Sequence, residues 1–209
     1  MKSILVASIL AAYIFNGQDP QIILSQQYKA YIIAQQLNPH GVIKMRDRIL
    51  NDKRRLPKSA KQFLEKNFAW DVFAEATLHN VWSELGTKQK KEYTKALKHM
   101  LLKRYAKYFN PDKKFSVRFP NQTLYKNLHG KKFAKVTTII SSISSDSELE
   151  AEFVFIFKNK HWMICDLYID GVSKSRSYRT AMRKLYKKYG YSGIISKIKN
   201  KITEYKKTS

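Results

Sequence analysis

Two neighbouring segments, residues 149–158 and 162–170, carry apolar side chains at both odd and even positions. Of all the features of the sequence, this one restricts the possible folds most strongly. Asn159-Lys160 predicts a tight turn that pairs the segments as antiparallel strands. The expected pairs are Phe157 with Trp162, Phe155 with Ile164 and Phe153 with Asp166 on one face, and Ile156 with Met163 and Val154 with Cys165 on the other. An antiparallel sheet with one face in water would alternate between apolar and polar residues. Helices or a ligand must therefore cover both faces, and the phenylalanine-rich face is the better candidate for either.

The chain changes from a helical to an extended pattern at Asn110-Pro111. Apolar residues at helical spacing predict earlier helices at about 20–38, 42–49, 59–68, 70–85 and 87–109. Alternation then predicts strands at 115–119, 124–128, 133–140, 149–158 and 162–170, followed by helices at about 173–189 and 192–205. The order predicts an α+β fold with N-terminal helices, a twisted antiparallel sheet of four to five strands and two C-terminal helices. A length of 209 residues fits one domain.

The N-terminus has the pattern of an export signal. Lys2 precedes an apolar run from Ile4 to Phe15, and polar residues follow. This run is too short to span a bilayer, but it suits the apolar region of a signal peptide. We interpret residues 1–18 as a signal peptide, which predicts a periplasmic or secreted mature chain. The alternatives are an uncleaved anchor and a buried first helix.

The net charge is +24, and lysine supplies 31 of the 40 cationic residues. Proteins that read bases rely on the bidentate guanidinium of arginine, and this chain has only nine arginines. The excess charge favours contact with anionic phosphates, whether on lipid or on nucleic acid. A bias of the whole composition towards Lys, Ile, Asn, Tyr and Phe would give the same excess without any function.

No arrangement of residues typical of catalysis or metal binding occurs. Cys165 is the single cysteine and lies in an apolar strand, which predicts a buried, inert thiol. The five histidines are scattered without the spacing of metal ligands. Asp166 is expected to accept hydrogen bonds, from Arg179 or Tyr178, rather than to pair with Asp170 for acid–base work. We therefore expect no catalytic residue, no metal and no cofactor.

The C-terminal pattern resembles the MlaC family of periplasmic phospholipid-binding proteins, which are linked to toluene tolerance. The matching residues are Trp162, Asp166, Asp170, Gly171, Val172, Ser173, Tyr178, Arg179, Gly190, Tyr191, Gly193, Ile194 and Ile195. A weaker helical match comprises Phe68, Ala74, Leu78, Trp82, Gln89, Tyr93, Leu101, Leu102 and Tyr105. The chain departs from the family at Ala69, where Asp is usual, at His79, where Gly is common, and at Lys174, where an apolar residue is common.

The resemblance implies a cone-like fold with an internal apolar pocket, formed by residues 19–209 as a single lipid-binding domain. It implies that the chain carries a phospholipid between an outer-membrane lipoprotein complex and an inner-membrane ABC transporter, in the periplasm, and so maintains the lipid asymmetry of the outer membrane.

The energetics of lipid extraction require such a pocket. Each methylene is worth about 0.8 kcal/mol, so two tails of roughly fifteen methylenes need compensation on the order of 24 kcal/mol. The candidate lipid-binding residues are Tyr105, Phe109, Phe153, Phe155, Phe157, Trp162, Ile164 and Tyr178. Cations that could meet the headgroup or the membrane are Arg179, Arg183, Lys187 and Lys188. The alternatives are an ordinary packed core and an ordinary solvated helix face.

Two other functions compete with a non-catalytic carrier. A cone-like α+β fold also suits a small-molecule enzyme, although the sequence offers no convincing acid–base pair. The charge alone suggests a basic nucleic-acid-binding module, against which stand the signal peptide and the small share of arginine.

Overall fold

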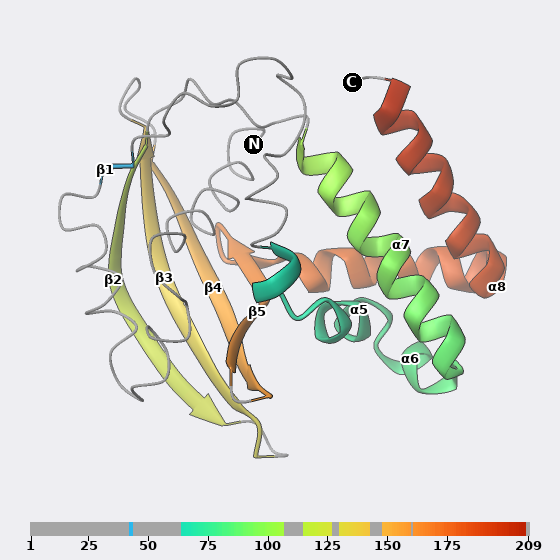
Figure 1. The fold of residues 1–209 in the computed structure, drawn as a ribbon, viewed down its shortest axis with the longest axis horizontal. Coiled ribbons are helices and arrows are strands. Elements are labelled where there is room, and N and C mark those ends of the chain that lie inside the picture. The colour runs from blue at the N-terminus through green and yellow to red at the C-terminus, as the bar shows by residue number, and fades with distance from the viewer. Residues whose placement is uncertain are drawn as a thin grey trace.

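The computed structural model describes residues 42–43, 64–106, 115–126, 130–142, 148–159 and 161–207 (Figure 1). Its elements, in chain order, are β1 (Val42–Ile43), α5 (Trp70–Leu78), α6 (Asn80–Glu84), α7 (Thr87–Ala106), β2 (Phe115–Lys126), β3 (Lys132–Ser142), β4 (Glu148–Lys158), β5 (His161–Ile169), β6 (Val172–Ser173) and α8 (Lys174–Lys207). Helices precede and follow the long antiparallel strands β2–β5, which confirms the predicted α+β class. The helix predicted at 42–49 is wrong at Val42–Ile43, which form a strand, and the one predicted at 20–38 lies outside the described residues.

The sheet is an antiparallel meander. Its six strands follow the order β1-β2-β3-β4-β5-β6, so that each strand pairs with its neighbour in the chain. Figure 1 shows the long strands bending, with α5, α7 and α8 gathered beyond β5. Two short strands were predicted at 115–119 and 124–128, but β2 runs through both with a register shift between Arg118 and Asn121. Pro120 lies in that shift, where a residue without an N–H group can be tolerated.

The pairing of β4 with β5 follows the prediction only near the turn. Phe157 pairs with Trp162, Ile156 with Met163 and Phe155 with Ile164, as predicted. Beyond them the register shifts, so that Val154 pairs with Asp166 and Phe153 with Leu167. Cys165 is the additional residue, and it forms a β-bulge in β5. The predicted pairs of Phe153 with Asp166 and of Val154 with Cys165 are therefore wrong.

The helix predicted over 70–85 is broken at His79. This residue has φ 53° and ψ −117°, a conformation that ends α5 and begins α6. The His79 N–H donates to the carbonyl of Glu75, and the His79 carbonyl accepts from the N–H of Trp82. Both backbone groups at the break are thus satisfied by the flanking helices.

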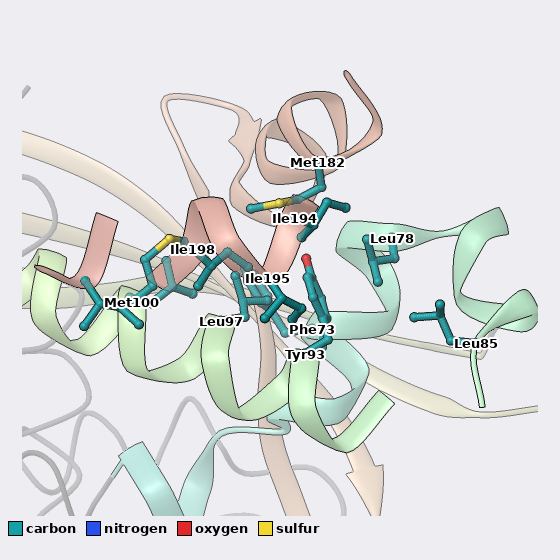
Figure 2. Close-up of a cluster of buried hydrophobic side chains, with 13 residues drawn as sticks. Phe73, Leu78, Leu85, Tyr93, Leu97, Met100, Met182, Ile194, Ile195 and Ile198 are labelled. Carbon is teal, nitrogen blue, oxygen red and sulfur yellow. The ribbon is translucent and has the colours of Figure 1, made fainter. Parts of the chain in front are cut away.

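Three helices share one apolar core, shown in Figure 2. Side chains from α5, α7 and α8 point towards one another, and Tyr93, Leu97, Ile194 and Ile198 are almost completely buried. The Tyr93 hydroxyl is hydrogen-bonded to Thr77 Oγ1 at 2.8 Å, which satisfies both hydroxyls inside the core. The helical part of the molecule therefore has a core of its own beside the sheet.

Helix α8 bends sharply at Gly190, which has φ 64° and ψ −169°. The bend separates two helical segments, as the glycine-containing sequence at 190–193 predicts. The second glycine serves close packing, because a Cβ at Gly193 would lie 2.2 Å from the Cβ of Tyr189. The bend lets both segments of α8 contribute to the core, with Met182 from the first and Ile194, Ile195 and Ile198 from the second.

Candidate lipid-binding site

Strand β3 has one fully buried face. Its residues alternate between buried and half-buried from Phe133 to Ser141. The buried ones are Ala134, Val136, Thr138 and Ile140. Alternation with this regularity shows that one side of the sheet is enclosed more completely than the other.

The buried face continues across β4 and β5 in three rows of directly paired residues. The rows are Ala134, Phe155 and Ile164; Val136, Phe153 and Leu167; and Thr138, Ala151 and Ile169. We call these nine residues the phenylalanine face. Leu167 is half-buried and the other eight are buried. All except Thr138 are apolar, so the face offers apolar contact with almost no hydrogen-bonding capacity.

Helix α5 packs on the opposite face of the sheet. Ala69, just before α5, joins Val154, Ile156 and Cys165 in a separate buried cluster, and Val72 packs against it. Burial raises the pKa of the Cys165 thiol to about 12, so the thiol stays protonated at neutral pH. This agrees with the prediction of a buried, inert cysteine. The phenylalanine face is therefore on the side of the sheet away from this contact with α5.

One end of the phenylalanine-rich side is open to solvent. Phe157 is 38% exposed and Leu124, which pairs with Ala134, is 43% exposed. The rings of Phe157 and Trp162 meet edge to face at 5.3 Å, and the ammonium of Lys132 lies 5.8 Å from the centre of the Phe157 ring. We call Phe157 and Trp162 the aromatic rim. The same side of the sheet thus changes from buried to exposed towards the β4–β5 turn, with a cation beside it.

Asp166 closes the corner between β5 and α8. Its carboxylate accepts hydrogen bonds from Ser173 Oγ at 2.7 Å and from Ser175 Oγ at 2.7 Å. It also accepts the backbone N–H groups of Leu167 at 2.8 Å and Ser175 at 3.0 Å. The Ser173 hydroxyl in turn accepts the N–H of Arg176. These bonds fix the start of α8 against the end of β5.

The donors predicted for Asp166 were wrong. Arg179 Nε donates instead to the carbonyl of Ala76 at 2.9 Å, which ties α8 to α5. The Tyr178 hydroxyl accepts from Arg104, and its ring packs edge to face on Phe73 in the helical core. Sequence reasoning missed Ser175, for which the only signal was a second serine two residues after the Gly-Val-Ser turn.

The predicted site residues fall into separate groups. Phe153, Phe155 and Ile164 belong to the phenylalanine face, and Phe157 and Trp162 to its aromatic rim. Tyr178 and Arg179 lie at contacts among the helices. The Tyr105 side chain and Phe109 lie outside the described part of the structure.

The cations Arg183, Lys187 and Lys188 on α8 are exposed, and the ammonium of Lys188 lies 5.2 Å from the ring centre of Tyr189. Lys174, where the family commonly has an apolar residue, is half-buried, and this burial lowers its pKa. Among the described residues, none of the helices combines the length and the apolar composition that a membrane-spanning segment needs. No group of His, Cys, Asp or Glu in that same part of the chain is suited to hold a metal ion.

Comparison with known proteins supports the predicted family. The chain is similar in fold to the phospholipid-binding protein from Ralstonia solanacearum, whose structure was solved in complex with a phospholipid. The TM-score is 0.58 at 13% sequence identity, over 69% of this chain and 80% of that one. No curated protein matches the chain. The family model described as MlaC protein matches residues 41–200, which is well over half of the sequence, and the chain therefore belongs to the MlaC family.

Proposed function

We propose that this protein binds a phospholipid, with the acyl tails against the phenylalanine face, and that it acts as a carrier and not as an enzyme. The observation that carries the proposal is this face itself: three rows of paired, almost entirely apolar residues on the side of the sheet away from the α5 contact. Family membership and the similar fold of a phospholipid-binding protein support the same function.

The chemistry of the face suits acyl chains. Tails of roughly fifteen methylenes need compensation on the order of 12 kcal/mol each when they leave a bilayer. Aliphatic and aromatic side chains provide this through contact and exclusion of water. Enclosure on the protein is essential, because a tail on an open surface would keep much of its contact with water.

The aromatic rim marks the end of the site nearest to water. Phe157 and Leu124 are apolar but exposed, as expected where tails pass between solvent and an enclosed site. Lys132 beside Phe157 supplies a cation at that end. On this proposal the glycerol and phosphate lie towards the β4–β5 turn and the tails extend over the buried rows.

Membership of the MlaC family supports a carrier role. We propose that residues 1–18 are an export signal, that residues 19–209 form the lipid-binding domain in the periplasm, and that the partners are an outer-membrane lipoprotein complex and an inner-membrane ABC transporter. The cations of α8 provide a surface for brief contact with anionic membranes. Charge reversal of Arg183, Lys187 and Lys188 together is expected to slow lipid transfer between anionic liposomes at low salt, and unchanged transfer would rule out this role for α8.

The central test is the lipid content of the purified protein. Extraction with organic solvent and mass spectrometry is expected to recover close to one phospholipid per chain. The variant Ala151→Leu, which adds volume to the phenylalanine face, should reduce that content. Cys165→Leu, which adds volume on the opposite face, is the matched control and should retain it. A wild-type extract without phospholipid, or equal loss in both variants at equal helical content by circular dichroism, would contradict the proposed site.

A further inference from the structure

One end of the sheet is basic. In an antiparallel meander the β2–β3 and β4–β5 turns lie at the same end. Lys131 precedes β3 and Lys132 begins it, and both are exposed, while Lys158 is the last residue of β4. The Lys132 ammonium lies 5.8 Å from the centre of the Phe157 ring, so these cations border the aromatic rim. On the proposed function, the glycerol and phosphate of a bound lipid lie at this same end.

The opposite end of the sheet is acidic. Strand β4 begins there with Glu148 and Glu150, both exposed. Asp170, just beyond β5, is also exposed, and its N–H donates to the Glu150 carbonyl. Of these acids, Glu148 forms an ion pair, with Arg118. The sign of the charge thus changes along β4, over about 33 Å at the usual rise per residue. A lysine-rich composition alone would make both ends of the sheet basic, so composition does not explain this pattern.

The basic end offers little to a headgroup amine. Asp71, at the start of α5, already forms an ion pair with Lys158. Among the described residues, Lys132 forms no ion pair. Its ammonium instead lies over the Phe157 ring, which would otherwise attract a choline group through its π-system. A phosphate at this end is attracted by the lysines, whereas the ammonium of an ethanolamine or choline group is repelled by them.

We propose that Lys131 and Lys132 make the site prefer phospholipids with a net anionic headgroup, such as phosphatidylglycerol, to zwitterionic ones. This inference rests on the proposed function and adds the class of lipid. The phosphate is common to both classes, so the difference arises from the amine, which cancels the charge of the phosphate in a zwitterionic headgroup. The acidic end repels an anionic headgroup, so the same charges also favour one orientation of the lipid along the sheet.

The test is a direct competition between phosphatidylglycerol and phosphatidylethanolamine with identical acyl chains. Delipidated protein is loaded from a large excess of uncharged detergent that contains both lipids in equal amounts, purified again and extracted for mass spectrometry. Wild-type protein is expected to hold about three- to tenfold more phosphatidylglycerol at low salt, the effect of two partly screened charge contacts. The ratio should fall towards one at about 1 M salt, where the Debye length is about 3 Å.

Three double variants assign the preference to this end of the sheet. Lys131→Gln with Lys132→Gln removes both charges and should bring the ratio close to one, while the total lipid per chain stays unchanged. Lys131→Arg with Lys132→Arg retains the charges and should keep the ratio. Lys88→Gln with Lys91→Gln is the matched control, because these exposed lysines lie on α7. It removes the same charge from the helical part and should keep the ratio, which separates the basic end from the general attraction of a chain of net charge +24 to anionic lipid.

The outcomes separate this proposal from the broader function. Equal loading of the two lipids into wild-type protein, or a preference for phosphatidylethanolamine, overturns the inference and leaves phospholipid binding intact. A preference that survives in Lys131→Gln with Lys132→Gln, or that falls equally in the α7 control, assigns it to the charge of the whole protein and also overturns the inference. A protein that takes up neither lipid overturns the proposed function and this inference together.

Discussion

His79 holds a backbone conformation that glycine adopts far more readily, and replacing it should stabilise the protein. With φ 53° and ψ −117°, it matches the first central position of a type II′ turn, where glycine dominates. The conformation is imposed from both sides, because the His79 N–H is bonded to Glu75 and its carbonyl to Trp82. The side chain itself is exposed, so its loss removes little packing.

The expected gain in stability is the difference between two effects. Holding a non-glycine residue in such a region costs about 1–3 kcal/mol. A glycine lowers stability by about 0.4–1 kcal/mol, because it gives the unfolded chain more conformations. For His79→Gly we therefore expect a net gain of about 1 kcal/mol, or roughly 2–4 °C in unfolding temperature for a domain of this size.

Urea unfolding of delipidated protein, followed by tryptophan fluorescence, measures this difference. Bound lipid must be removed, because a ligand that binds only the folded state adds its own stabilisation. The midpoint should rise for His79→Gly with an unchanged dependence on urea. His79→Ala is the control, since alanine keeps the unfavourable conformation and should show no gain. A stability of His79→Gly at or below that of the wild type, or an equal gain in both variants, would refute the argument from backbone strain.

Three further predictions concern other parts of the molecule. Asp166→Ala should lower the free energy of unfolding by about 2–3 kcal/mol, because it leaves buried hydroxyls without their acceptor, whereas the exposed Asp170→Asn should lie close to the wild type in the same urea titration. Gly193→Ala should cost more than about 2 kcal/mol, since the new Cβ would overlap the Cβ of Tyr189; a wild-type unfolding temperature would show that the bend relaxes freely. Cys165, with a pKa of about 12, should react with iodoacetamide at pH 8 only after unfolding, and rapid labelling of the native protein would contradict its burial.

The sequence predicted the pairing of β4 with β5 only as far as local geometry determines it. A tight turn sets the register of the residues next to it, so the partners of Phe157 and Phe155 followed from the sequence. The bulge at Cys165 depends on longer-range contacts, because Asp166 must reach serines that lie beyond the end of the strand. Turn geometry carries no information about that requirement, and the predicted partners past Cys165 were wrong.

The helical half shows a similar limit. Apolar periodicity continues through residues 70–85, so nothing in the pattern indicates the break, and His79 is not a residue that usually marks one. Tyr178 and Arg179 were predicted at the lipid site or near Asp166 because they follow the Gly-Val-Ser turn. Their actual positions depend on how α8 docks against α5 and α7, which is a tertiary property.

The carboxylate of Asp166 has consequences for how this protein can vary. Four donors already occupy its two oxygens, so a positively charged lipid amine would have to displace an internal bond in order to reach it. Asp166, Ser173 and Ser175 should also be retained or replaced together, since losing any one of them leaves the others without a hydrogen-bond partner. Among relatives of this chain, a replacement at position 166 should therefore be accompanied by replacements at 173 and 175, while the residues around them change independently.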